Sequence, residues 1–202
     1  MAGPSERIIG LYEDNAAAFD QQRARGLFER AWIDLLTADL SPGAAILDLG
    51  CGMGEPIAQH FIGQGFRVTG IDSAPALIAL CRERFPDQAW IAGDMRDLAL
   101  GRRFDGLIAW HSMFHLPPED QRAMFPRLGA HAAPGAALMF TSGSSEGDAI
   151  SAWQGEPLYH GSLSPPEYRA LLAAEGFEVL RHVECDPDCG GAAVWLARKA
   201  TD

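Results

Sequence analysis

This 202-residue sequence has few basic residues, few cysteines and no long apolar run. Its 16 Lys and Arg against 27 Asp and Glu give a formal net charge of −11. Such a field repels a phosphate backbone, which argues against nucleic acid as a partner. No window reaches the roughly 18 apolar residues that a membrane helix needs, so we expect no membrane partner. Residues 1–10 lack the order of a signal peptide, and we predict a cytoplasmic protein.

Four cysteines are too few for a disulfide scaffold at this length, and we expect free thiols in a reducing compartment. Cys185 and Cys189 flank Asp-Pro-Asp, the one spacing that could attract a metal. No second Cys or His pair stands at zinc spacing, so we interpret this segment as a turn and predict no metal site.

Hydrophobic residues make up 48% of the chain and charged residues 21%, which is typical of soluble globular proteins and excludes a disordered one. The length fits one α/β domain, and we predict a single domain over residues 1–202. The oligomeric state is left open between a monomer and a homodimer.

Short apolar runs alternate with helical segments after residue 43, a pattern that predicts a parallel sheet with right-handed crossovers. The helices begin with recognisable signals, among them Pro56, Ser73 and a Pro-Pro pair at 117–118. Before this pattern, residues 12–40 predict one or two amphipathic helices. The predicted strands are 45–49, 66–71, 89–92, 104–110 and 136–141.

The last third of the sequence departs from this alternation. Residues 143–163 show no sustained period, and we expect a long loop there. Ser164 then opens a helix through Ala174 with a capping-box pattern. Two strands follow at 177–184 and 192–198, and their short connection permits only a hairpin, so the final strand is antiparallel.

The strongest functional signal is the glycine-rich segment from Asp48 to Gly54, where an apolar strand runs into three alternating glycines and then a helix. Glycines suit a tight turn and a ligand lying against the backbone. A lone loop of this kind can also be a purely structural turn. Glu55 stands where a dinucleotide fingerprint needs its third glycine, which argues against NAD or FAD.

Acidic residues follow the next two predicted strands. Asp72, with Ser73 beside it, stands where a carboxylate can accept both hydroxyls of a ribose. Asp94 and Met95 pair a polar with an apolar side chain, suited to the amine and ring face of an adenine. Each acid alone could be a solvated turn residue. Together they lie at the carboxyl ends of successive strands, where open α/β sheets bind ligands.

These motifs, with the stretch from Phe104 to His111, resemble the class I S-adenosylmethionine-dependent methyltransferases over about residues 45–199. The resemblance implies a Rossmann-like, seven-stranded, mostly parallel sheet with an antiparallel last strand and helices on both faces. It implies S-adenosylmethionine as the cofactor, S-adenosylhomocysteine as its product, and methyl transfer to a small molecule. The cofactor-binding residues that we predict on this basis are Asp48, Gly50, Cys51, Gly52, Gly54, Asp72, Ser73, Asp94, Met95, Trp110, Tyr12 and Phe19.

In the resemblance, the three glycines pack against the methionine part of the cofactor and Asp48 supports its ammonium. Tyr12, Phe19 and Arg23 look like the N-terminal helix that small-molecule members fold over the cofactor. Core packing for Phe19 and solvent exposure for Arg23 remain alternatives. The chain lacks the Asn/Asp-Pro-Pro-Tyr/Phe motif of many adenine and glutamine methyltransferases after the fourth strand, which favours a small-molecule acceptor.

No motif identifies a catalytic base. Methyl transfer from a sulfonium mainly requires alignment and exclusion of water, so a base is optional. Our candidates for a base or a substrate-lining residue are His111, His115, Tyr159 and His160. We predict a helical cap at residues 1–44, a cofactor-binding core at 45–142, a lid or substrate loop at 143–163, and a helix with terminal hairpin at 164–202.

Three functions remain open from the sequence. A small-molecule methyltransferase leads. A sensor or partner subunit that binds S-adenosylmethionine without turnover has the same binding motifs. An NAD or nucleotide-sugar enzyme on a similar sheet is the weakest because of Glu55.

Overall fold

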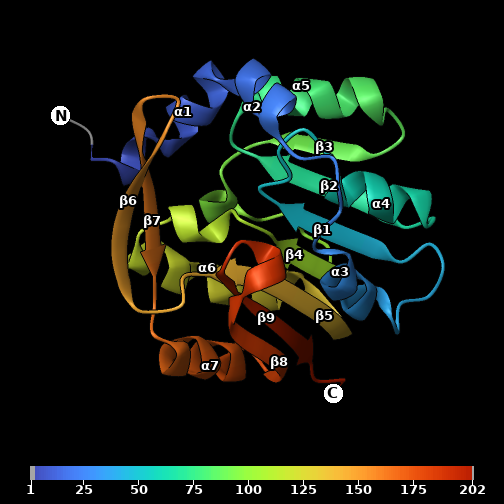
Figure 1. The fold of residues 1–202 in the computed structure, drawn as a ribbon. Helices are drawn as coiled ribbons and strands as arrows, with labels where there is room; N and C mark the ends of the chain where they lie inside the picture. Colours follow the sequence, from blue (N-terminus) through green and yellow to red (C-terminus); the bar gives the residue numbers. More distant parts are fainter. Residues whose placement is uncertain (1–2, 202) are drawn as a thin grey trace.

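The computed structural model describes residues 3–201; the remaining three residues of the predicted 1–202 domain lie outside it. Seven strands form one sheet in the order β3-β2-β1-β4-β5-β9-β8 (Figure 1). The first five run parallel, whereas β9 runs antiparallel to both β5 and β8. The predicted Rossmann-like sheet with its antiparallel last strand is confirmed.

The strand bounds agree with the sequence pattern to within a few residues. The seven strands are β1 (Ala45–Leu49), β2 (Arg67–Asp72), β3 (Ala89–Ala92), β4 (Phe104–Ala109), β5 (Ala132–Ser142), β8 (Phe177–Asp186) and β9 (Ala192–Lys199). The helices that follow the N-terminal region are α4 (Ile57–Gly63), α5 (Pro75–Arg84), α6 (Pro118–His131) and α7 (Pro165–Ala174). Ser164 caps α7 because its hydroxyl accepts the Glu167 N–H, as the capping pattern predicts.

Helices cover both faces of the sheet, and each face has its own core. Ile46 of β1 packs in the core under α4, while its neighbour Leu47 packs on the opposite face under α6 and α7. This alternation follows from the two-residue period of a strand buried on both sides. Phe61 and Phe125 are fully buried anchors of the two cores.

The N-terminal region contains more helix than the sequence predicted. A 3₁₀ turn, η1 (Ser5–Arg7), precedes α1 (Ile8–Asp14), α2 (Ala16–Gln22) and α3 (Arg30–Thr37). Helix α3 packs on the sheet through Trp32, Ile33 and Leu36. Helices α1 and α2 instead lie over the carboxyl ends of the strands, beside α5 (Figure 1). We call α1 and α2 the cap.

The expectation of an irregular loop over residues 143–163 is wrong. This segment forms a separate antiparallel hairpin of β6 (Gly147–Trp153) and β7 (Glu156–Ser162). Most of β6 is exposed on both faces, so its side chains carry no alternating apolar pattern from which a strand could be predicted. Gln154 and Gly155 turn the chain, both with positive φ.

The connection from β8 to β9 is the predicted turn. A short 3₁₀ turn, η4 (Pro187–Cys189), lies between the strands, and Gly190 continues it in the left-handed region at φ 67°. All four cysteines are free thiols. Within residues 3–201 no cluster of three or more His, Cys, Asp or Glu could hold a metal ion, and no helix is long and apolar enough to cross a membrane.

Candidate active site

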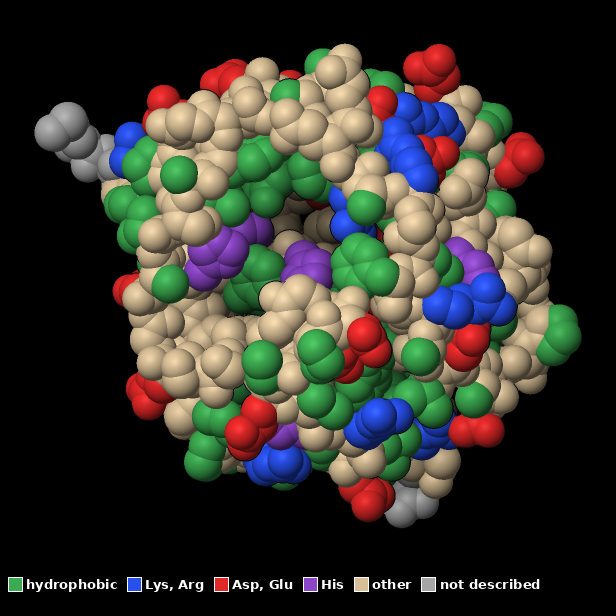
Figure 2. Space-filling view, viewed as in Figure 1, with side chains coloured by type: hydrophobic (Ala, Val, Ile, Leu, Met, Phe, Trp, Pro, Cys, Tyr) green, Lys and Arg blue, Asp and Glu red, His purple; other side chains and the backbone are tan. Residues whose placement is uncertain are grey.

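A cavity of about 380 Å³ opens at the carboxyl ends of β1 to β4, beneath the cap. Figure 2 shows the hollow, with histidine side chains gathered around it. The predicted residues on its wall are Tyr12, Phe19, Arg23, Asp48, Gly50, Cys51, Gly52, Asp72, Ser73, Asp94, Met95, Trp110, His111 and His115. Gly54, Tyr159 and His160, also predicted, are not on the wall.

The loop after β1 needs glycine for two different reasons. Gly50 has φ +73°, and a Cβ there would lie 2.3 Å from the Cβ of Ser112, so the Ser112 side chain, in the segment after β4, leaves no room for a side chain at this position. Ser112 in turn donates its hydroxyl to the Leu49 carbonyl at 2.6 Å. At Gly54 a Cβ would instead press on Phe85 and Cys81, which shows that this glycine serves packing against α5.

Asp48 is a buried carboxylate on the cavity wall without a hydrogen-bond partner among the described residues. Burial, together with the nearby charge of Asp72, raises its pKa to about 7, and the charge of Arg23 partly offsets this rise. A buried carboxylate of this kind is strongly disfavoured as an anion unless a cation lies against it. The site therefore favours a cationic group beside Asp48.

Asp72, at the end of β2, fixes the loop that holds these groups. Its two carboxylate oxygens accept the backbone N–H groups of Gly52 and Ala74, both at 2.9 Å. Burial raises the pKa of Asp72, while these hydrogen bonds oppose the rise. Each oxygen keeps a further lone pair that a hydroxyl group of a ligand can use.

Asp94 has a built-in counterion that the sequence did not reveal. Arg96 donates to its Oδ2 from Nε at 2.9 Å and from Nη2 at 2.6 Å, and the Arg96 backbone N–H donates to Oδ1. Arg96 also pairs with Asp120 of α6 at 3.1 Å. These bonds to Arg96 outweigh the effect of burial and lower the pKa of Asp94.

The segment after β4 supplies His111 in an unusual backbone conformation. His111 is one of two described non-glycine residues with positive φ, at 48°, and its backbone N–H donates to Thr141 Oγ1. Its ring lies on the cavity wall and makes no hydrogen bond to the described part of the protein. Burial, assisted by Arg23 and His160, lowers its pKa to about 4, so the ring is neutral near pH 7.

His115 is locked in one tautomer. Its Nδ1 lies 2.7 Å from the carbonyl oxygen of Tyr159, which can only accept, so Nδ1 carries the proton. Burial lowers the pKa of His115 to about 4, and the neutral ring leaves Nε2 as the acceptor of the Tyr12 hydroxyl at 3.1 Å. This chain joins the cap to the β6–β7 hairpin through η3 (Met113–His115).

Tyr159 and His160 lie behind the residues that line the cavity, where they contact His115. The Tyr159 hydroxyl donates to Asp148 at 2.6 Å, and its backbone carbonyl holds His115. The His160 ring lies 5.0 Å from that of His115, centroid to centroid, and 5.2 Å from Phe114. Both residues therefore support His115 from the second hairpin strand.

The hairpin tip and the cap contact each other over the cavity. Trp153 stacks on Tyr12 with ring centroids 5.2 Å apart and meets Phe19 edge-on at 6.1 Å. The Trp153 and Gln154 side chains both donate to Gln22 of α2. Segments more than 130 residues apart thus cover the same opening.

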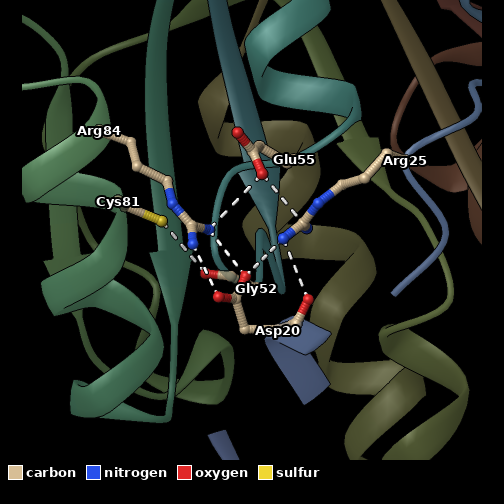
Figure 3. A network of polar contacts seen from close by, with 6 residues as sticks. All are labelled: Asp20, Arg25, Gly52, Glu55, Cys81 and Arg84. Atoms are coloured by element: carbon tan, nitrogen blue, oxygen red, sulfur yellow. Dashed lines mark hydrogen bonds and ion pairs between the residues drawn. The ribbon is translucent and has the colours of Figure 1, made fainter. Parts of the chain in front are cut away.

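A polar network ties the cap to the glycine loop (Figure 3). Asp20 of α2 lies between Arg25 and Arg84, at 2.8 and 2.7 Å, and both guanidiniums also face Glu55. The Cys81 thiol donates to the Gly52 carbonyl at 3.2 Å. Glu55, whose charge argued against a dinucleotide, here holds the two arginines.

Comparison with known proteins finds a match over part of the sequence and over the fold. Residues 46–135 match the family model described as a methyltransferase domain. The whole chain superimposes on a Burkholderia thailandensis 1,6-didemethyltoxoflavin-N1-methyltransferase, solved with its substrate and S-adenosylhomocysteine, with a TM-score of 0.73 and 24% identity over 99% of this chain and 92% of that one. Residues 46–135 therefore match a methyltransferase domain, and the chain has the fold of this solved methyltransferase. An amino pentose methyltransferase from Micromonospora echinaspora, solved with S-adenosylmethionine, shares the fold of this chain at a TM-score of 0.70 and 22% identity, over 93% of this chain and 96% of that one.

Two curated relatives share a shorter stretch with this chain. Trans-aconitate 2-methyltransferase of Escherichia coli O1:K1 / APEC is 38% identical over 90 residues, which is 44% of this chain and 35% of the relative. A Streptomyces fradiae dTDP-3-amino-3,6-dideoxy-alpha-D-glucopyranose N,N-dimethyltransferase is 35% identical over 109 residues, 52% of this chain and 42% of the relative. The matched stretch thus spans less than half of each relative.

Several residues on the cavity wall could not be identified as site residues from the sequence. Ile8 and Ile9 of α1 reach the cavity, as do Glu119 and Asp120 at the start of α6. In the sequence, the acidic pair is typical of the first turn of a helix, and the two isoleucines are typical of the apolar helix face that packs in a core. Ser112 could have been suspected only from the steric demand of Gly50.

Proposed function

We propose that this chain binds S-adenosylmethionine in the cavity and transfers its methyl group to a small-molecule acceptor. The observation that carries the proposal is that a carboxylate without a partner among the described residues, Asp48, and a guanidinium, Arg23, line the same cavity. The amino-acid end of the cofactor is a zwitterion, which needs one anion and one cation side by side. The unpartnered Asp48 fits the ammonium, and Arg23 fits the carboxylate.

The other wall residues fit the nucleoside. Asp72 would accept the ribose hydroxyls with its remaining lone pairs while still holding the loop. Asp94 and Met95 would lie against the adenine, with Arg96 keeping Asp94 ionised. A side chain at Gly50 would meet Ser112, and one at Gly52 would meet Phe19 of the cap, so glycine at both positions keeps this part of the cavity wall free of side chains. When bound, the cofactor supplies a methyl group on a positively charged sulfur.

The chain's own contribution to transfer is alignment and exclusion of water. Trp110, His111 and His115 line the cavity at the end of β4, next to the segments that cover it. The cap and the hairpin tip, joined through Trp153, would close over the acceptor as a lid. The free thiols suit the reducing cytoplasm.

Non-catalytic binding of S-adenosylmethionine is the second candidate. It is favoured by the weak basicity of both wall histidines, whose pKa values are lowered to about 4. Calorimetry with S-adenosylmethionine, followed by detection of S-adenosylhomocysteine with a panel of acceptors, separates the two. Tight binding without release on any acceptor would favour a sensor.

Asp72 tests the binding site directly. Asp72→Ala is expected to weaken S-adenosylhomocysteine binding by ~2 kcal/mol, the range for hydrogen bonds to a charged group. Asp72→Asn, which keeps one carbonyl oxygen, should lose less. Asp87→Ala removes the same charge from an exposed site and serves as the control. Unchanged affinity in Asp72→Ala would contradict the proposed ribose contact.

A further inference from the structure

The cavity wall is strongly acidic, and its few cations are already paired. Seven carboxylate residues line it against two arginines. Arg96 is held by Asp94 and Asp120, with contacts of 2.6 and 3.1 Å. Arg23 pairs with the fully buried Glu29 at 3.3 Å and is the group that suits the cofactor carboxylate. No guanidinium or ammonium on the described wall is left for an anionic acceptor.

We call the part of the wall formed by His111, His115 and Tyr12 the acceptor end, and its side chains are neutral. His115 and Tyr12 use their polar atoms on each other and on Tyr159. His111 is the exception, since both of its ring nitrogens are without a protein partner among the described residues. The backbone of His111 is strained, with φ at 48°. The ring that it places on the cavity wall can form a hydrogen bond with a ligand.

These facts narrow the chemistry of the acceptor. A hydroxyl becomes a good nucleophile only when a base takes its proton, and the wall histidines are weak bases. A thiolate, enolate or carboxylate needs no base but brings a negative charge into an acidic cavity. An uncharged nitrogen has a lone pair ready to react and brings no charge.

We propose that the acceptor is an uncharged amine without an anionic group, and that His111 accepts a hydrogen bond from its reacting N–H. This inference rests on the proposed function. The nitrogen lone pair forms the new N–C bond while the S–C bond of the donor breaks and its electron pair stays on sulfur. The extra proton on nitrogen then leaves to water. His111 orients the lone pair by holding the N–H.

Three probes of one ring size test the acceptor class: aniline, phenol and benzoate. Their binding to the protein loaded with S-adenosylhomocysteine is measured by ligand-observed NMR, and methyl transfer from S-adenosylmethionine by mass spectrometry. Aniline is expected to bind at least about tenfold more tightly than benzoate, because a carboxylate meets like charges. N-methylaniline should be the methylated product. Equal or tighter benzoate binding, a methylated phenol in preference to aniline, or binding of none of the three would overturn the proposal.

His111 is tested separately. His111→Phe should weaken aniline binding by about fivefold to tenfold, the range for one hydrogen bond, while affinity for S-adenosylhomocysteine stays the same. His111→Asn tolerates positive φ and keeps an acceptor oxygen, so it should retain most of the aniline affinity and guards against a folding defect. His60→Phe, outside the cavity, is the matched control. Unchanged aniline binding in His111→Phe would refute the role of His111. Calorimetry with S-adenosylmethionine reports on the proposed function independently of both tests.

Discussion

The two walls of the cavity are built by different means. The cofactor wall comes from the ends of neighbouring strands, with Asp72 accepting two backbone N–H groups and Ser112 filling the space that Gly50 leaves. The lid wall comes from the cap, and the β6–β7 hairpin packs on the cap from outside through the rings of Trp153 and Tyr12. One wall is tied by backbone geometry, the other by side-chain contacts at the surface.

The two walls therefore differ in the free energy needed to disrupt them. Steric exclusion and buried hydrogen bonds are costly to break, whereas one aromatic pair contributes about 0.5–1.5 kcal/mol and one exposed ion pair less than about 1 kcal/mol. We therefore expect the lid wall to open more easily than the cofactor wall. Such a division lets a ligand enter without unfolding the sheet.

The largest expected effect is on the cofactor wall, at Gly50. Gly50→Ala combines positive φ with a clash against Ser112, and we expect a loss of ~3 kcal/mol or more in the free energy of unfolding. Gly43→Ala has nearly the same φ, +76°, but open space around it, and should lose only ~1 kcal/mol. Urea denaturation of both variants measures the difference. Equal losses would show that Ser112 moves aside from a new side chain at little cost in free energy.

Asp48 gives the next largest effect, with opposite signs for stability and binding. Its pKa is raised to about 7 in the folded protein, so the cofactor-free protein loses stability as pH rises from the unfolded pKa through 7. Asp48→Asn should therefore stabilise the cofactor-free protein at pH 8 by on the order of 2 kcal/mol and change it little at pH 4.

The same variant should bind S-adenosylhomocysteine more weakly at pH 8, because the ammonium loses its anion. Thermal unfolding and calorimetry at pH 4 and 8 measure both quantities. Asp72, whose pKa is also raised, contributes to the pH dependence of the wild type, so the comparison is always between variant and wild type at one pH. A lower stability of Asp48→Asn than of the wild type at pH 8 would contradict the raised pKa of Asp48.

The sequence predicts that Asp48, Asp72 and Asp94 meet, and the structure places all three on one cavity wall. Asp48 lies in β1, Asp72 ends β2 and Asp94 follows β3, and parallel strands bring their carboxyl ends to one edge. Local sequence therefore fixes where these residues meet. The exception is Gly54, whose role against Phe85 depends on where α5 packs.

The lid wall could not be predicted to the same extent. The β6 strand is mostly exposed, so no alternation marks it, and the 143–163 segment looked like a loop. The contact of Trp153 with Tyr12 joins segments that only tertiary packing brings together. The tautomer of His115 likewise depends on a carbonyl 44 residues away.

Trp153 tests the lid wall itself. Trp153→Ala removes the stack on Tyr12 and should raise the KM of the acceptor by about threefold to tenfold, in line with one aromatic pair. Affinity for S-adenosylhomocysteine should change less. Ile150→Ala, on the same hairpin but 55% exposed, is the control and should behave as wild type. An equal effect of both variants would mean that the hairpin acts only through its folding.

The smallest effect is expected where the two walls are joined, at the ion pair of Asp20 with Arg84. Two arginines lower the pKa of Asp20 to about 2, so the pair contributes stability above pH 4 that is lost as pH falls through 2. Arg84→Gln should cost ~0.5 kcal/mol or less in unfolding, because the pair is partly exposed.

Hydrogen exchange of α2 reports more sensitively on this pair, since it detects local opening of the cap. Exchange in α2 should rise in Arg84→Gln, and the increase should shrink in high salt, where the wild-type pair is itself weakened. Arg30→Gln breaks a comparable exposed pair, with Asp34 within α3, and should leave α2 unchanged. If α2 exchanges at the wild-type rate in Arg84→Gln, the pair of Asp20 with Arg84 does not hold the cap, and the remaining contacts of the cap, such as Tyr12 with Trp153 and Asp20 with Arg25, are sufficient.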